Sequence, residues 1–221
     1  AQTTVQNATL LVRQGKIVAV GNNITIPKDA VIIDCSGKFI YPAFIDIYSD
    51  YGINVSNAPQ QNFTSAAAFF RTQQLTSGTK GAYGWNQALK PETEAYKIFT
   101  ADEAKAKALR DIGFGSVLTH QKDGIARGSG AFVTLAAQPD NFVILKDKAS
   151  AHYSFSKGSS SQSYPGSMMG MIALLRQTYL DAQWYKTNPV TEGVNLSLKN
   201  WNDNQSLPQI FEANDKWNDL R

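Results

Sequence analysis

Three side chains capable of acid-base or ligand chemistry follow one another at a spacing of two: Asp46, Tyr48 and Asp50. Side chains two residues apart on a β-strand point to the same face, so the two carboxyl groups and the phenol are expected to share one surface. Two carboxyl groups held close together can divide acid and base roles between them. The commoner outcome of such a grouping is a polar network that fills an interior position, and we favour that interpretation.

The chain contains two histidines, His120 and His152. His120 follows the short run 117–119, so we expect it at the C-terminal end of a strand, where the catalytic groups of βα barrels are found. A single histidine in such a place is more often a hydrogen-bonded structural residue, so His120 and Asp50 stand only as candidates for a catalytic role. His152 lies in the stretch Ala-His-Tyr-Ser-Phe, which predicts no metal-ligand or nucleophile partner for it.

Three smaller features have structural explanations. The serine run 159–161 lacks the Gly-x-Ser-x-Gly context of a strained nucleophile, which indicates a solvated loop. Residues 128–130, Gly-Ser-Gly, lack the strand-loop-helix context of a phosphate loop and predict a tight turn. Cys35 is the single cysteine, which excludes an internal disulfide, and its apolar surroundings predict a buried thiol.

The elements that position these groups begin with residues 39–47, a nearly continuous apolar run typical of a strand buried on both faces. Residues 100–103, Thr-Ala-Asp-Glu, form a capping box for a helix over 104–112 that Gly113 ends. A strand over 115–119 follows. The order strand, helix, strand predicts a βαβ unit that carries a polar, aromatic insertion at 54–91.

The flanking segments complete the pattern. The first forty residues predict a small β-meander with strands at 9–13, 17–20 and 31–33. Further short strands are expected at 131–135, 142–145 and 207–213, and Asn214-Asp215 is expected to cap another helix. The longest helix is expected over 168–185, with apolar side chains at spacings of three and four. Its stripe comprises Met168, Met171, Ile172, Leu175, Tyr179 and Ala182.

The segment Gly-Lys-Phe-Ile-Tyr-Pro-Ala-Phe-Ile-Asp-Ile-Tyr-Ser-Asp-Tyr-Gly, residues 37–52, resembles the first barrel strand of the amidohydrolase superfamily, most closely its imidazolonepropionase-like branch. Residues 15–21 are similar to a strand of that family's β-sandwich, and residues 108–119 and 128–135 to its next helix, strand and glycine-rich turn. The resemblance implies an α/β fold in which a small β-sandwich segment, 1–38, precedes the first part of a (β/α)8 TIM-like barrel, 39–221.

The departure from the family motif concerns the metal. The resemblance implies a His-x-His pair that binds a divalent cation, whereas this chain has Tyr48 and Asp50 at those positions. A phenol with a pKa of about 10 is a poor zinc ligand, and one carboxylate cannot replace two imidazoles in a site that needs about three protein ligands. Residues 210–213, which loosely resemble another ligand strand, also lack histidine. We therefore expect no metal cofactor and regard positions 48 and 50 as vestigial, with zinc as the alternative.

Three functions are compatible with this pattern. The first is a catalytically degenerate amidohydrolase-like domain, inactive by itself, that acts as the scaffold or interaction half of a longer protein. The second is a metal-dependent hydrolase of non-peptide C–N bonds, in an amide or cyclic imide, in which the missing barrel half supplies ligands and Asp50 with His120 completes the site. The third is a ligand-binding module that uses the insertion, where Tyr83 and Trp85 lie beside Asn and Gln.

Charge and hydropathy limit the classes of binding partner that the chain can have. The net charge is only +3 in 221 residues and the basic residues are scattered, which argues against nucleic acid. No apolar run approaches the roughly 18 residues of a membrane helix, so we expect a soluble bacterial protein of the cytoplasm or periplasm. An open part of a barrel would expose strand edges, so we expect the remainder of the parent polypeptide, or a homo-oligomer, to cover them.

Overall fold

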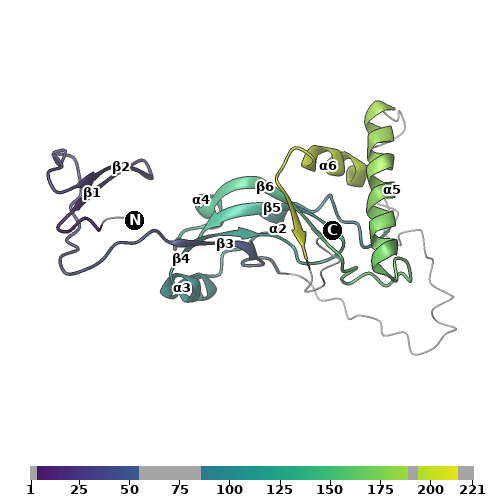
Figure 1. Ribbon diagram of the computed structural model, residues 1–221, viewed down its shortest axis with the longest axis horizontal. Coiled ribbons are helices and arrows are strands. Elements are labelled where there is room, and N and C mark those ends of the chain that lie inside the picture. The colour runs from purple at the N-terminus through teal and green to yellow at the C-terminus, as the bar shows by residue number, and fades with distance from the viewer. Residues whose placement is uncertain (1–3, 55–85, 189–193, 214–221) are drawn as a thin grey trace. The chain divides into compact units, whose positions relative to one another are not determined.

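The computed structural model describes residues 4–54, 86–188 and 194–213, which belong to two compact units, 1–42 and 43–221 (Figure 1). Most of the predicted insertion lies outside the described residues, including Tyr83 and Trp85. The predicted cap at Asn214-Asp215 also lies outside them.

The first unit contains a β-hairpin of β1 (Thr9–Arg13) and β2 (Lys16–Gly21). Its two-residue loop has positive φ at both Gln14 (51°) and Gly15 (72°), as a tight turn between twisted strands requires. These two predicted strands are confirmed. The strand predicted at 31–33 is wrong, because this segment pairs with no described strand. Cys35 is a free thiol that is partly buried, less than expected.

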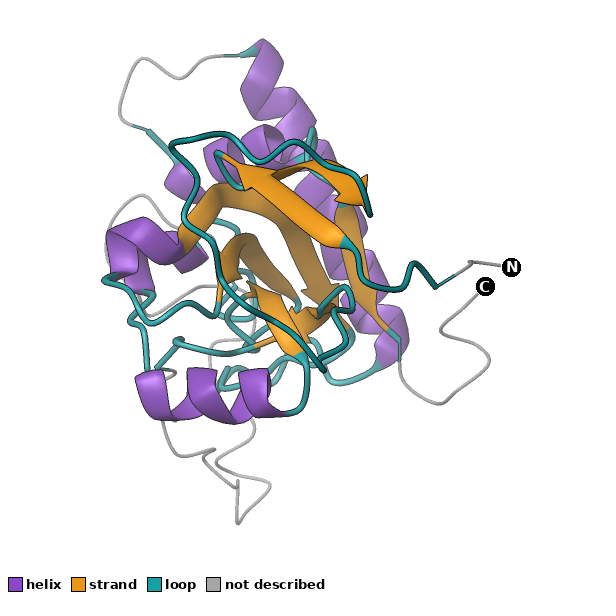
Figure 2. Ribbon diagram, turned by 90° about the vertical axis from the view of Figure 1, so that its left-hand side faces the viewer, coloured by secondary structure: helices purple, strands orange, loops and turns teal. Residues whose placement is uncertain are grey.

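The second unit is built on a curled five-stranded sheet, with its helices packed around it (Figure 2). The strands lie in chain order: β3 (Phe44–Ser49), β4 (Phe114–Thr119), β5 (Ala126–Thr134), β6 (Ile144–Ser154) and β7 (Gln209–Glu212). β3 and β4 are parallel, as are β6 and β7, while β5 runs antiparallel to both of its neighbours. This mixed α/β architecture, a small antiparallel sheet followed by part of a TIM-like barrel, confirms the predicted fold class, with β5 as a reversed strand that the prediction lacked.

The predicted βαβ unit is present as β3, α3 (Glu103–Asp111) and β4. The N-cap is Asp102, whose carboxylate accepts a hydrogen bond from the Lys105 N–H, and not Thr100 as predicted. The backbone N–H of Thr100 donates instead to the carbonyl of Gly52, which keeps this residue in an extended bridge outside the helix. Gly113 ends the helix region with a φ of 101°, as predicted.

β3 is not buried on both faces as its sequence predicts. Phe44, Ile45 and Ile47 are 66%, 56% and 63% exposed. The physical reason is its position at the edge of the sheet, where β4 is its one neighbour among the described strands.

The segment around Pro139 also differs from the prediction. Instead of a strand over 142–145, a short helix α4 (Asp140–Val143) precedes β6, because the Phe142 N–H turns back to the Pro139 carbonyl. β6 then extends to Ser154, so His152 lies on a strand.

Two apolar cores flank the sheet. One packs α2 (Ala95–Ile98) and α3 against β4 and β5, around Val117, Val133 and Leu135. The other packs α5 (Met168–Thr187) and α6 (Leu196–Asn204) near β5 and β6, around Ile125 and Leu174.

Helix α5 is confirmed, but its buried stripe is different from the predicted one. Leu174, Thr178 and Ala182 are buried, whereas Ile172 and Tyr179 are exposed. Helix α5 carries apolar side chains on all of its sides, so their spacing alone does not identify the face that is buried. In the described ranges no helix is long and apolar enough to cross a membrane.

Candidate functional site

Five side chains from five segments meet where the parallel strands of the sheet end. Parallel strands end at the same edge, and the reversed β5 begins there, which explains why residues distant in sequence converge. We call this group the strand-end cluster: Tyr48 on β3, His120 directly after β4, Arg127 on β5, His152 on β6 and Glu212 on β7.

The two histidines form a stacked pair. Their ring centroids lie 3.7 Å apart with an interplanar angle of 7°. His120 is 0% exposed and His152 2% exposed. The local sequence around each histidine does not indicate that they meet, because they are far apart in the chain and are brought together by the strand order β4-β5-β6.

Gly130 makes this stack possible. It pairs with Ser150 across to β6, and a Cβ on Gly130 would lie 2.7 Å from His152 Nε2 and 2.9 Å from Ser150 Oγ. The predicted tight turn at 128–130 is therefore wrong, because this segment lies inside β5. A glycine within a strand is a known sign of close approach by another group, and it was the sequence signal for the pair.

Both imidazoles are held neutral. Burial, followed by electrostatic interaction with His152, Arg127 and Lys122, lowers the pKa of His120 to about 2. Burial and then Arg127 lower the pKa of His152 to about 4. Among the described residues no carboxylate acts on either ring, because Glu212 is paired with Arg127, so a proton on either imidazole would be opposed by both burial and the guanidinium charge.

The hydrogen bonding of the two rings differs. His152 Nε2 lies 2.7 Å from the hydroxyl oxygen of Ser150. His120 has neither ring nitrogen within hydrogen-bonding geometry of another described group, although both are buried. Each such group costs free energy relative to a paired one.

Arg127 is the fixed cation of the cluster. It is 5% exposed as a residue, and it donates from Nη1 to the Tyr48 hydroxyl at 3.2 Å and from Nε to the Gly124 carbonyl at 3.1 Å. Its Nη2 forms an ion pair with Glu212 Oε2 at 2.7 Å. Sequence analysis did not identify Arg127 or Glu212, since nothing in their local sequence indicates that they meet.

Tyr48 lies between the aromatic and charged parts of the cluster. Its ring is 5.0 Å from that of His120, and the Lys122 ammonium lies 4.3 Å from its ring centroid. Burial raises the pKa of the phenol, partly offset by its hydrogen bond from Arg127. Tyr48 is therefore a neutral phenol at pH 7 and not a phenolate ligand.

The carboxylates of Asp46, on β3, and Asp50, directly after it, have different partners. Asp46 Oδ1 accepts a hydrogen bond from the backbone N–H of Tyr48 at 2.9 Å. Asp50 lies 3.6 Å from the Lys122 ammonium, and its side chain is 62% exposed. His120 is fully buried, so the two catalytic candidates Asp50 and His120 occupy different environments.

The arrangement does not fit the metal that the family resemblance implies. A neutral imidazole binds a metal through a lone pair in its ring plane, at about 2.0–2.1 Å for zinc. The planes of His120 and His152 are nearly parallel and 3.7 Å apart at their centroids, so both rings cannot direct lone pairs at one ion. Across the described ranges no group of three or more His, Cys, Asp and Glu side chains is arranged to hold a metal ion.

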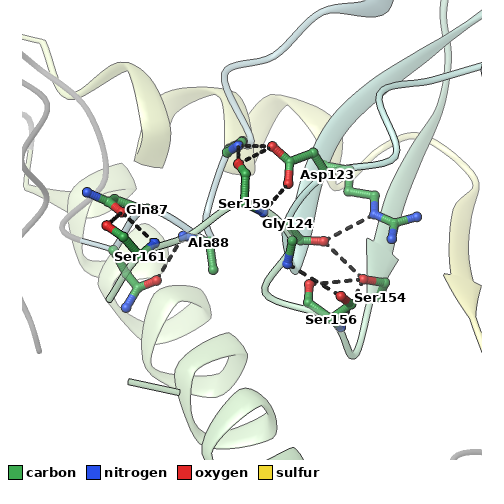
Figure 3. A network of polar contacts seen from close by, with 12 residues as sticks. Gln87, Ala88, Asp123, Gly124, Ser154, Ser156, Ser159 and Ser161 are labelled. Atoms are coloured by element: carbon green, nitrogen blue, oxygen red, sulfur yellow. Dashed lines mark hydrogen bonds and ion pairs between the residues drawn. The ribbon is translucent and has the colours of Figure 1, made fainter. Parts of the chain in front are cut away.

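Figure 3 shows a second polar group, which we call the serine network. It is linked to the cluster through the Gly124 carbonyl, which accepts a hydrogen bond from Arg127. The Asp123 carboxylate accepts hydrogen bonds from the Ser159 backbone N–H at 2.7 Å and from the Ser159 hydroxyl at 2.6 Å, and it forms an ion pair with Lys90. The Lys90 ammonium also lies 3.2 Å from Ser159 Oγ. Further along, Gln87 Oε1 accepts from the backbone and hydroxyl of Ser161.

The serine network is not a nucleophile site. Its Lys90 and Ser159 hydrogen bonds lower the pKa of Asp123 despite burial, which makes this carboxylate a weak base. The Lys90 side chain is engaged in its ion pair with that carboxylate, so it acts as the charge partner of Asp123 in this network. The predicted loop at 159–161 is present, but it is not solvated as predicted: Ser160 is buried, and Ser159 is hydrogen-bonded to Asp123 in the segment after β4.

The comparisons with known proteins show the fold. No protein-family model matches the chain, and no curated protein matches it. The crystal structure of an amidohydrolase from Thermotoga maritima MSB8 is similar, with a TM-score of 0.66 and 22% sequence identity over 96% of this chain and 54% of that one. The chain thus spans about half the length of that protein. It therefore has an amidohydrolase-like fold that corresponds to about half of the Thermotoga structure.

Proposed function

We propose that this chain is a non-catalytic, amidohydrolase-like half barrel that acts as the scaffold or interaction half of a longer protein. The observation that carries the proposal is the edge strand β3, which exposes Phe44, Ile45 and Ile47. An apolar strand edge is an unstable surface in water and a template for pairing with further strands. The partner that fits it is the rest of a barrel, from the same polypeptide or from a second copy.

The chemistry of the strand-end cluster supports the non-catalytic part of the proposal. Active sites of βα barrels lie at this end of the strands. Here the end contains a neutral phenol, two neutral stacked imidazoles and an arginine already paired with Glu212. None of these groups is both exposed and free to act as a base or nucleophile.

The motif at 37–52 supports a relationship with the imidazolonepropionase-like branch, with Tyr48 and Asp50 in place of the histidine pair. On that basis the loss of both histidines removed the hydrolytic metal, and the fold was kept for assembly.

The test is the state of the purified chain. We expect an oligomer or aggregate in size-exclusion chromatography and binding of an apolar dye, because one edge of β3 is unpaired among the described strands. The double variant Ile45→Lys/Ile47→Lys should elute at a smaller size and bind less dye. Met169→Lys, which changes an exposed apolar side chain of α5, is the matched control and should change neither. A compact wild-type monomer with one sharp cooperative melt would contradict the proposal.

A second candidate is a metal-dependent hydrolase of amide or cyclic imide bonds, completed by the other barrel half. The buried, unpaired nitrogens of His120 favour it, because a neutral imidazole without a partner is available as a ligand. Elemental analysis and an amidase assay of the full-length protein decide between the candidates. About one zinc per barrel together with turnover that a chelator abolishes would favour the hydrolase.

A further inference from the structure

Arg127 connects the two edges of the curled sheet. It lies on the central strand β5, yet one of its terminal nitrogens contacts Tyr48 on the first strand and the other contacts Glu212 on the last. Its third donor, Nε, holds the Gly124 carbonyl in the segment after β4. All three guanidinium nitrogens are thus used, in three directions.

The charge of this group is permanent. Arginine does not lose its proton in proteins, and the Arg127 side chain is only 6% exposed. Its counterion is Glu212, while the neighbouring His120 and His152 stay neutral partly because of its field. A second cation in the cluster would be repelled by the guanidinium at short range, in a place that water screens poorly.

We propose that the Arg127 guanidinium is the built-in cation of the strand-end cluster, that it holds Tyr48 and Glu212 together, and that it thereby excludes a divalent metal ion from this end of the sheet. The inference rests on the proposed non-catalytic function and extends it. If replacement of the histidine pair were the whole change, restoring histidines at positions 48 and 50 would restore metal binding. A buried guanidinium already paired with Glu212 makes such a reversion ineffective.

The zinc experiment compares two variants that differ only at Arg127. Each protein is incubated with zinc chloride, desalted and measured by elemental analysis, and cobalt absorption reports ligand geometry. The variant Tyr48→His/Asp50→His should retain little zinc while Arg127 is present. The variant Tyr48→His/Asp50→His/Arg127→Met should bind zinc about tenfold more tightly or better, because the repelling charge is gone and Glu212 is released. Equal zinc binding by the two variants, whether strong or absent, would overturn the proposal.

A stability experiment tests the pairing without metal. Arg127→Met and Glu212→Gln should each lower the urea midpoint, since each leaves one partner uncompensated. The double variant Arg127→Met/Glu212→Gln should recover most of the loss, and strictly additive losses would overturn the pairing. If Arg127→Met does not fold, Arg127→Lys replaces it. That variant keeps the charge but not the planar guanidinium, so it should still exclude zinc and should unfold at a lower urea concentration. Zinc retention by it would overturn the proposal.

The outcomes separate this inference from the proposed function. The function fails if the wild-type chain is a closed monomer or if the full-length protein hydrolyses amides, and neither result depends on Arg127. The inference fails if zinc binding and urea midpoints do not respond to Arg127, and that result leaves the assembly of β3 with a partner unaffected.

Discussion

The strand-end cluster and the serine network are linked through the hydrogen bond from Arg127 to the Gly124 carbonyl, next to Asp123, yet their polar groups are hydrogen-bonded to different extents. In the serine network each oxygen of Asp123 accepts a hydrogen bond, and its charge is balanced by Lys90. In the cluster, His120 keeps both nitrogens buried and unpaired, and two neutral imidazoles lie near a guanidinium. A fully satisfied network makes the structure around it rigid, whereas unpaired buried groups cost free energy.

The largest loss of stability is expected from a substitution at Gly158, in the serine network. Its φ is 58°, and a Cβ there would overlap Asp123 Oδ1 and lie 2.5 Å from the Gly124 nitrogen. Gly158→Ala should lower the free energy of unfolding by roughly 4–5 kcal/mol, measured in urea. Gly166→Ala is the control, because its nearest neighbour would be 3.5 Å away. An equal, small effect of both substitutions would show that the loop is not fixed by Asp123.

The two regions should titrate in separate pH ranges. The folded-state pKa values of His120 and His152 are about 2 and about 4, below the unfolded value near 6.5. The two histidines therefore leave the free energy of unfolding undiminished above pH 6.5 and lower it as the pH falls below that value, because the unfolded chain then binds protons that the folded one does not. Between pH 7 and pH 5 each ring should cost roughly 2 kcal/mol of unfolding free energy. Asp123 affects stability at lower pH. Because its folded-state pKa is lowered, its stabilising effect on the folded state is retained until the pH falls below about 3.8.

The control for this pH profile is His120→Phe. It keeps an aromatic ring against His152 and removes two unpaired buried nitrogens, so stability at pH 7 should be unchanged or higher. The slope of stability between pH 7 and pH 5 should fall to about half. An unchanged slope would show that His120 does not titrate on unfolding as its burial predicts.

Asp123→Asn should weaken the serine network by roughly 2 kcal/mol, because the amide loses the charge that balances Lys90 and offers the network only one acceptor oxygen. Thermal or urea unfolding at pH 7 measures the change. Asp181→Asn is the matched control, since Asp181 accepts a hydrogen bond from Gln177 on the exposed side of α5. Its effect should stay within about 0.5 kcal/mol.

The smallest expected effect concerns two serines near the cluster. Ser150→Ala removes the hydroxyl beside His152 Nε2 and should cost roughly 1 kcal/mol. Ser129→Ala removes a buried hydroxyl without a hydrogen-bond partner, so it should be neutral or slightly stabilising. The same sign and size for both would contradict the assigned hydrogen bond of His152.

The sequence predicted the elements that depend on local pattern. The hairpin β1–β2, the unit β3–α3–β4, helix α5 and strand β7 all follow from turn residues, capping and apolar spacing. It failed where a local signal has two meanings, as at Gly128-Ser129-Gly130, where glycines can mark either a turn or a crowded strand. The cluster could not be predicted, because Tyr48 and Arg127 are brought together by the curl of the sheet and not by proximity in the chain.

The reversed strand β5 has a consequence for how the chain reaches this structure. β4, β5 and β6 form an antiparallel meander over residues 114–154, joined by short connections, whereas pairing of β3 with β4 must first close the long segment 50–113. Local pairing forms quickly, and distant parallel pairing requires loop closure. The meander also holds Val117, Ala131 and Val133, which are fully buried. We therefore expect the meander to be the folding nucleus of the unit and the β3 edge to form late, and hydrogen exchange tests this: the meander amides should exchange last and those of β3 first.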